Sequence, residues 1–241
     1  MSTITVRKSD DRGDSDLGWL HSRFSFSFAG YYDPALDGYR SLRVINEDRV
    51  TGGAGFGRHG HSNFEIFSYV LEGALRHEDS MGNVEILKPH DVQFTSAGSG
   101  IMHSEYNADP RDDVRFLQMW VKPRERGLKP SYNSKTFGVD AKHNKLCRIL
   151  SPDGADGSIT INADVSVFAS LLDDGAAVRH DFVGTHGYIH VPKQPGSLGV
   201  EVNGVELGPG DGAFISEAAS VEIVGRASED KQAEFVMFDL A

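Results

Sequence analysis

Residues 58–105 read RHGHSNFEIFSYVLEGALRHEDSMGNVEILKPHDVQFTSAGSGIMHSE, and this stretch decides the fold. It begins with His59-Gly-His61 and ends with His103-Ser-Glu105, two triplets in which every second residue carries a potential ligand atom. Residues two apart on a β-strand point to the same face of the sheet. If both strands line one cavity, three imidazoles and one carboxylate converge there, a set that suits a divalent first-row transition metal.

Between the two triplets, apolar runs of strand length alternate with turn signals. Residues 64–78 follow a strand pattern interrupted at Glu72-Gly73, residues 79–83 form a hairpin-like loop, and residues 88–91 form a tight turn around Pro89. The chain contains 27 glycines, which favours many turns, and helical periodicity is nearly absent. The sequence therefore predicts an all-β protein.

Composition and charge exclude several classes of protein. The chain has 241 residues, enough for one large domain or two of ordinary size. Its net charge of −11 argues against direct binding to nucleic acid or to an anionic membrane surface. No apolar run approaches the roughly 18 residues that a membrane-spanning helix needs. The N-terminus lacks a signal-peptide core and Cys147 is the single cysteine, so we expect a cytoplasmic protein.

An internal repeat divides the chain, with an offset of about 120 residues. Six positions are identical: Asn83, Leu87, Pro89, Asp91, Phe94 and Ser96 match Asn203, Leu207, Pro209, Asp211, Phe214 and Ser216. A Pro-X-Asp turn that recurs in both halves predicts two β-barrels of the same plan. The polar segment between them, residues 126–145, has no strand pattern and is interpreted as a linker.

The same offset indicates that the repeat has lost its ligands in the second half. His59 and His61 fall near Arg179 and Asp181. His103 and Glu105 fall on Ile223 and Gly225. We therefore expect the second half to keep the fold without the metal, which leaves one metal site per chain.

Several segments resemble the pirin family of bicupins, and most closely its bacterial members with quercetin dioxygenase activity. They are residues 19–32, 43–46, 61–73, 77–83 and 97–105. The resemblance is dense over about residues 1–125 and thinner to the end of the chain. It implies two cupin-type antiparallel β-barrels (double-stranded β-helices), with a metal-binding barrel over 1–125, the linker over 126–145 and a second barrel over 146–241.

The resemblance also implies the ligand set. In the pirin family the metal is held by the residues that match His59, His61, His103 and Glu105. This chain departs from the family pattern at two places: Gly60 stands where proline is usual, and Pro89-His-Asp91 replaces the usual Pro-Gly-Asp turn. Neither change removes a ligand, although Gly60 loosens the strand.

Two further residues share the strand parity of the ligands. Glu65 and His77 are interpreted as groups that orient the ligands or act as alternate ligands. Three histidines and one glutamate do not fix the metal: iron is favoured by the family, while manganese, nickel, copper and zinc also accept this set. An apolar wall for a flat ligand is expected from five residues, namely Phe56, Phe67, Phe94, Met102 and Phe116.

Two functions follow from the resemblance. The first is a metal-dependent dioxygenase that opens flavonols such as quercetin, itself a stand-in for an unidentified native substrate, with a flat aromatic molecule and O2 as reactants. Glu105 would accept the 3-hydroxyl proton as a general base. The alternative is a non-catalytic, redox-sensing protein that binds the metal and modulates transcription factors or metabolic enzymes as its protein partners. In either case we expect a monomer, because one chain already supplies two barrels.

Overall fold

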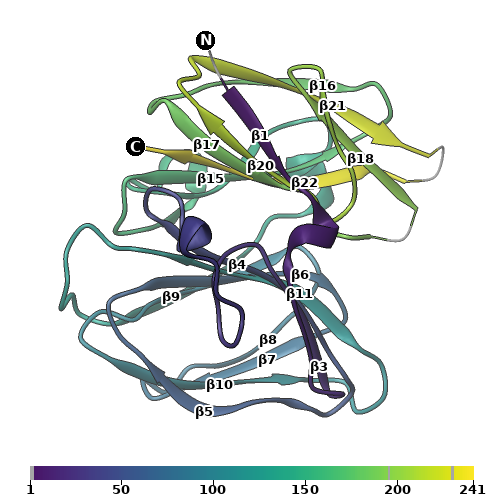
Figure 1. Cartoon of the computed structure of the whole chain (residues 1–241). Helices are drawn as coiled ribbons and strands as arrows, with labels where there is room; N and C mark the ends of the chain where they lie inside the picture. Colours follow the sequence, from purple (N-terminus) through teal and green to yellow (C-terminus); the bar gives the residue numbers. More distant parts are fainter. Residues whose placement is uncertain (1–2, 195, 229–230) are drawn as a thin grey trace. The chain divides into compact units, whose positions relative to one another are not determined.

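Two compact units made almost entirely of β-strands form the chain, as Figure 1 shows. This computed structural model describes residues 3–194, 196–228 and 231–241. The N-terminal unit comprises residues 13–136 and 161–163, and the C-terminal unit comprises residues 137–160 and 164–241 together with the described residues up to Arg12. The expected all-β fold is confirmed, although the sheets are open and do not close into barrels.

The N-terminal unit consists of two sheets. The larger sheet has the strand order β12-β9-β6-β11-β4-β3-β2, and the smaller has the order β5-β10-β7-β8. The strands are β2 (Gly13–Asp16), β3 (Leu20–Phe24), β4 (Leu42–Val50), β5 (Gly55–His61), β6 (Glu65–Glu72), β7 (Leu75–Asp79), β8 (Val84–Leu87), β9 (Asp91–Ser96), β10 (Ile101–Asn107), β11 (Val114–Val121) and β12 (Ser131–Thr136), with a 3-10 turn at Pro34–Leu36.

Apolar side chains from both sheets form the core of this unit. One group of them comprises Leu20, Val50, Val70, Leu75, Leu87, Val114 and Phe116. Burying one such side chain stabilises the fold by about 1.5–3 kcal/mol. A slip of one residue in any strand would turn its apolar set toward water, so this core fixes which residues of β5 and β10 face inward.

The C-terminal unit repeats the plan. Its larger sheet has the order β1-β20-β17-β22-β15-β13-β14, and its smaller sheet has the order β16-β21-β18-β19. The strands are β1 (Thr3–Arg7), β13 (Cys147–Ser151), β14 (Ile159–Thr160), β15 (Val165–Leu172), β16 (Ala177–Asp181), β17 (His186–His190), β18 (Ser197–Val202), β19 (Val205–Leu207), β20 (Gly212–Ser216), β21 (Ser220–Ala227) and β22 (Ala233–Leu240). The short helical elements are η1 (Ser9–Asp11), α1 (Val139–Lys142) and η3 (Ala155–Gly157).

None of the helices in the described part of the chain has the length and apolar character that crossing a membrane requires.

The repeated Pro-X-Asp turn has the same hydrogen bonds in both units. In the N-terminal unit the Asp91 carboxylate accepts the backbone N–H of Lys88 at 2.7 Å. In the C-terminal unit the Asp211 carboxylate accepts the backbone N–H of Gly208 at 3.0 Å. The aspartate is therefore required by the turn itself, which explains why it recurs at the repeat offset.

Two strands lie outside the segments expected from the sequence. β1 pairs with β20, so the first described residues belong to the C-terminal unit and not to the N-terminal one. The Asp211 carboxylate holds the end of β1, because it accepts the Lys8 Nζ at 2.8 Å and the Ser9 N–H at 2.7 Å. β12 lies within the expected linker and pairs with the edge of β9. It is largely polar and exposed, so it lacks the apolar alternation by which a strand is recognised.

The turn before β9 contains a non-glycine residue in the left-handed region. His90 has φ = 75°, and Gly210 at the same place in the other turn has φ = 86°. A side chain in this conformation costs about 1 kcal/mol relative to glycine. We predict that His90→Gly raises the free energy of unfolding by about 1 kcal/mol, measured by urea titration of the metal-free protein.

A matched control uses alanine at the same place. His90→Ala keeps a Cβ atom in the left-handed region, so it should not reproduce the gain. An equal increase in both variants would show that the imidazole, and not the backbone conformation, is responsible.

Candidate metal centre

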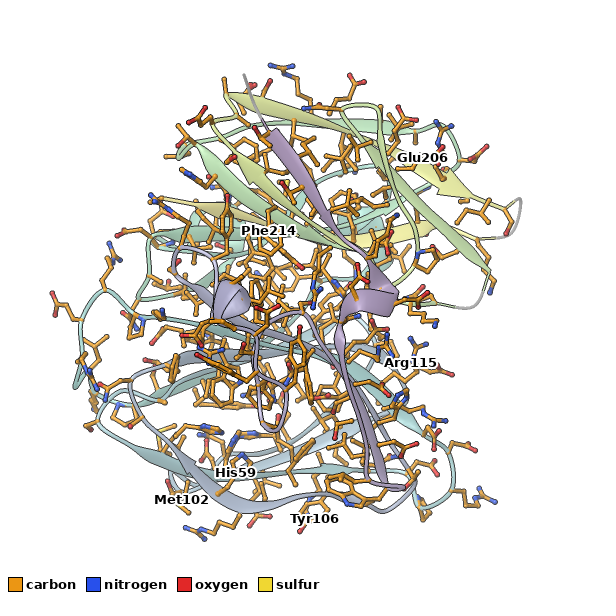
Figure 2. All side chains as sticks on the ribbon, viewed as in Figure 1. His59, Met102, Tyr106, Arg115, Glu206 and Phe214 are labelled. Atoms are coloured by element: carbon orange, nitrogen blue, oxygen red, sulfur yellow. The ribbon has the colours of Figure 1, made fainter. Side chains whose placement is uncertain are left out.

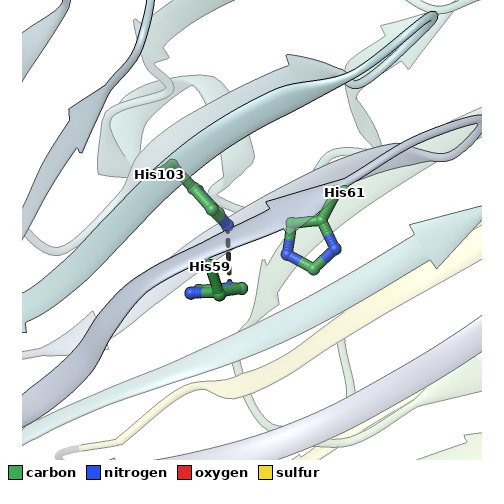
Figure 3. Close-up of side chains that lie close together, drawn as sticks. All are labelled: His59, His61 and His103. Atoms are coloured by element: carbon green, nitrogen blue, oxygen red, sulfur yellow. Dashed lines mark hydrogen bonds between the residues drawn. The ribbon is translucent and has the colours of Figure 1, made fainter.

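Three imidazoles from β5 and β10 meet on the inner face of the smaller sheet, as Figure 3 shows. The antiparallel register places His59 opposite His103 and places His61 opposite Ile101. The ring centroids are 4.7 Å apart for His59 and His61, 4.5 Å for His59 and His103, and 4.8 Å for His61 and His103. One potential ligand atom from each ring lies within 4.8 Å of the others.

The protonation of His59 follows from its hydrogen bond. Its Nδ1 lies 2.8 Å from the Gly57 carbonyl oxygen, which accepts hydrogen bonds only, so Nδ1 carries the proton. In the neutral ring the lone pair is then on Nε2. This atom lies 3.0 Å from the His103 Nε2. Two nitrogens that bind one ion at about 2.1 Å and at roughly a right angle are about 3 Å apart, so the pair fits a shared metal.

Burial keeps the other two imidazoles neutral, which is the form that binds metals. Loss of hydration, followed by the repulsion of His103 and His59, lowers the pKa of His61 to about 4. Loss of hydration, followed by the repulsion of His59 and His77, lowers the pKa of His103 to about 3. Both rings therefore offer lone pairs at neutral pH.

Glu105 lies outside the group formed by His59, His61 and His103, although it is close to His103. The register between β10 and β5 shifts between His103 and Glu105, where a bulge occurs. The Glu105 side chain is buried, and its Oε2 accepts a hydrogen bond from the Gln118 Nε2 at 2.9 Å. The Ser68 hydroxyl lies 3.2 Å from the Glu105 Oε1. Glu105, His103 and His77 form a second group of buried ligand atoms within 4.8 Å of one another.

The structure places His77 and Glu65, the two additional candidates from the sequence, in different surroundings. His77 is part of the second group, where its Nε2 lies 3.3 Å from the Asp79 carboxylate and its ring stacks on Tyr132 at 4.7 Å. Glu65 belongs to neither group. Its carboxylate accepts the Ser96 hydroxyl at 2.6 Å and the Asn162 N–H at 3.1 Å, and it thereby fixes residues 161–163 to the N-terminal unit.

The expected apolar wall is only partly present. Phe67, Phe94 and Phe116 are buried, and Phe116 packs with the apolar group that includes Leu75 and Leu87. Met102 alternates with His103 along β10 and is 40% exposed on the outer face, where Figure 2 shows it directed away from the interior. Met102 is therefore not part of an inner wall, because its strand parity is opposite to that of the ligands.

Sequence analysis missed three residues that contact the site: Ser68, Gln118 and Trp120. Trp120 packs edge-on against the His61 ring with centroids 4.8 Å apart. Ser68 and Gln118 are buried polar residues flanked by apolar ones in β6 and β11. A buried polar side chain needs a partner, so an isolated serine or glutamine in an apolar strand is a usable signal for a nearby polar site.

The strand register corrects the alignment of the two halves. Ile223 of β21, which matches His103 at the repeat offset, pairs with Val178 and not with Arg179. Val178 therefore stands where His59 stands, and His180 stands where His61 stands. The chain from His180 to its partner Val221 is one residue longer than the chain from His61 to its partner Ile101, a difference that the fixed offset could not detect.

Three of the four ligand positions carry an apolar residue or glycine in the C-terminal unit, while His180, at the position of His61, has its Nε2 2.9 Å from the Asp239 carboxylate. Ile223 is fully buried in its core, and Val178 packs against the same core. Val200 is opposite Gly225, as His77 is opposite Glu105. Among the described residues, both groups that could hold a metal lie in the N-terminal unit.

The lowered pKa values make the stability of the metal-free protein depend on pH. Between about pH 6.5 and pH 4 the unfolded chain binds more protons than the fold, because His61 and His103 protonate only in the unfolded chain. We predict that the free energy of unfolding decreases as the pH falls from 6.5 toward 4. Urea titrations in the presence of a chelator measure this dependence.

The double variant His61→Gln and His103→Gln removes both titrating groups and should flatten that dependence. An unchanged slope in the double variant would contradict the assignment and would place the titrating groups elsewhere.

Comparison with known proteins identifies the family of the chain. The family model described as Pirin matches residues 5–121, and the model described as Quercetinase C-terminal cupin domain matches residues 148–240. The chain is 40% identical to a quercetin 2,3-dioxygenase from Escherichia coli over 238 residues, which cover 98% of each chain. It is 39% identical to a pirin-like protein from Caulobacter vibrioides over 99% of this chain and all of the relative.

A solved structure of a bacterial pirin is also similar. The crystal structure of YhhW from Escherichia coli in complex with nickel(II) has a TM-score of 0.90, 37% sequence identity and 99% coverage of both chains. The expected resemblance is confirmed by these matches over nearly the whole length. The chain therefore belongs to the pirin family.

Proposed function

We propose that this pirin-family protein is a dioxygenase that opens flavonols such as quercetin at a divalent metal held by His59, His61, His103 and Glu105. The observation that carries the proposal is the convergence of three imidazoles from β5 and β10, one of which, His103, also lies close to the buried Glu105 carboxylate. The names of several relatives, among them the quercetin 2,3-dioxygenase of Escherichia coli, support the substrate class. We propose iron(II) as the resident metal; the nickel(II) complex of YhhW supports a divalent ion of this kind.

The bound metal would supply a positive charge that favours the enolate form of the substrate, and the one-electron chemistry that reaction with O2 needs. The residues of the chain prepare the substrate for that chemistry. Glu105 accepts the proton of the 3-hydroxyl group as a general base. Trp120 and Phe64, whose centroids are 5.3 Å apart, limit the space next to His61 on one side.

A pocket of about 360 Å³ borders His61. Its lining also includes Gly60, Ser62, Ser80, Gly100, Ile101 and Met102, the last of which stands on the outer face of the sheet. Pockets that take small molecules generally have volumes of about 300–1,000 Å³, so a flat aromatic ring system fits this size.

The first experiment follows the absorbance of quercetin in air and under anaerobic conditions. Protein stripped of metal is reloaded with iron, manganese, nickel, copper or zinc in separate samples. We predict oxygen-dependent loss of quercetin with at least one metal, and fastest with iron. If no metal supports such loss, the protein is not a flavonol dioxygenase, and a metal-dependent interaction protein becomes the better hypothesis.

The second experiment compares two glutamates. Glu105→Gln removes the base while keeping the shape of the side chain, so we predict that kcat falls by about 10²–10⁴-fold. Glu65→Gln is the matched control, because the Glu65 carboxylate binds Ser96 and Asn162 and does not reach the metal groups. Its kcat and metal content should stay within about twofold of the wild type. A loss of metal in the Glu65 variant would instead make Glu65 the fourth ligand.

The third experiment measures how the metal holds β5. This strand is at the edge of its sheet and pairs with β10 alone among the described strands, and it contains Gly55, Gly57 and Gly60. With free metal at 100 times Kd, an opening of β5 that releases the ion is suppressed about 100-fold. We predict that removing the metal with a chelator speeds amide hydrogen exchange of residues 55–61 by about 100-fold.

β16 provides an internal control in the same sample. It is also an edge strand, but Val178 fixes it to an apolar core. Exchange of residues 177–181 should therefore be the same with and without metal. Equal acceleration of both strands would indicate global destabilisation and not the release of β5.

A further inference from the structure

The Glu105 carboxylate is held by a buried pair of side chains from β6 and β11. Ser68 is fully buried, and Gln118 is 8% exposed. The Gln118 Nε2 donates to the Glu105 Oε2 at 2.9 Å. The Ser68 hydroxyl lies 3.2 Å from the Glu105 Oε1 and also 3.2 Å from the Gln118 Oε1. A hydroxyl has one hydrogen to donate, so Ser68 can serve only one of these two oxygens at a time.

We infer that Ser68 and Gln118 are positioning residues that let Glu105 move on and off the metal without losing a hydrogen bond. The inference rests on the proposed function, in which Glu105 is both a ligand and a base. When the Glu105 Oε1 binds the ion, Ser68 donates to the Gln118 Oε1. When Glu105 leaves the ion, the hydroxyl turns and donates to the Glu105 Oε1.

The fixed donor in both states is the Gln118 amide. It keeps its bond to the Glu105 Oε2, so the carboxylate can turn about this contact and remain in the site. A buried carboxylate oxygen without a donor is strongly unfavourable, because its hydration is lost without compensation. The Ser68 hydroxyl removes that penalty from the detached state, in which Glu105 is able to accept a substrate proton.

The C-terminal unit supports this assignment, because it keeps the strands without the polar pair. Ser68 pairs with Gln118 in the register of β6 and β11. The matching pair in β17 and β22 is Ile189 and Met237, both buried in the core of the C-terminal unit. The position of Glu105 is occupied there by Gly225. The fold therefore does not need a serine or a glutamine at these positions. The polar pair is present in the unit that contains the Glu105 carboxylate and absent from the unit that lacks it.

Met237 supplies the substitution for the test. Gln118→Met copies the residue that the same fold accepts, and Ser68→Ala removes only the movable donor. Each variant and the wild type are stripped of metal and titrated with cobalt(II) in competition with a chelator. The visible absorption spectrum of cobalt(II) reports how many ligands it has, and quercetin turnover gives kcat and KM with the metal that supports activity.

The two variants should differ in a defined way. Gln118→Met loses the fixed donor, so we predict metal affinity about 10–100-fold weaker and a changed cobalt spectrum. Ser68→Ala removes a hydrogen bond in both states, but only in the detached state does a charged carboxylate oxygen lose its donor. Metal affinity should therefore be equal or tighter, while kcat falls at least about tenfold and KM stays unchanged. The thermal midpoint of the metal-free protein should not fall in Gln118→Met, because methionine suits the buried position.

The outcomes separate this inference from the proposed function. Affinity, spectrum and kcat equal to the wild type in both variants would overturn the roles of Ser68 and Gln118 and leave the metal site intact. Equal losses of affinity and kcat in both variants would also overturn the inference, since the two donors would then act as one structural unit. A wild-type protein that binds no cobalt(II) would overturn the proposed site and this inference together.

Discussion

The antiparallel pairing of β5 with β10 is the constraint on which the candidate site depends. It sets His59 opposite His103 and puts all three imidazoles on one face. The apolar core fixes which face that is, because buried residues of β10 alternate with residues that are partly or fully exposed. The grouping of the potential ligand atoms is therefore a consequence of strand parity. A slip of one residue in either strand would turn its ligand side chains to the outer face.

Comparison of the two units shows how much apolar packing is given up where polar ligands line the space between the sheets. In the C-terminal unit three of the corresponding positions are filled by Val178, Ile223 and Gly225, and the fourth is His180, which pairs with Asp239. Val178 and Ile223 add apolar contact to the core of that unit. In the N-terminal unit the same space holds desolvated imidazoles and a carboxylate, which add little hydrophobic stabilisation of their own. One copy of the fold thus retains a full core, and the other exchanges part of its core for polar groups that can bind a metal.

Much of the fold and of the site could be predicted from the sequence, because both depend on local rules. Alternation along a strand identifies the His-X-His and His-X-Glu triplets, and the Pro-X-Asp turn identifies the repeat. Residues that act through distant partners could not be predicted. β1 is recognised as part of the C-terminal unit only through its pairing with β20. The structural role of Glu65 depends on its hydrogen bond from Asn162, which is 97 positions away in the sequence. β12 is a polar edge strand and carries no apolar pattern.

Three glycines lie in β5, the strand that carries two of the histidines. Glycine weakens a strand because it leaves more conformational freedom to lose and adds no side chain to pack. At Gly55, a Cβ atom would lie 2.4 Å from the Glu105 carbonyl oxygen, so the close approach of β5 to β10 requires glycine there. On the same pair of strands, the Nε2 atoms of His59 and His103 lie 3.0 Å apart. Under the proposed function, a metal ion bound by both rings would compensate for the weakness that the glycines give β5.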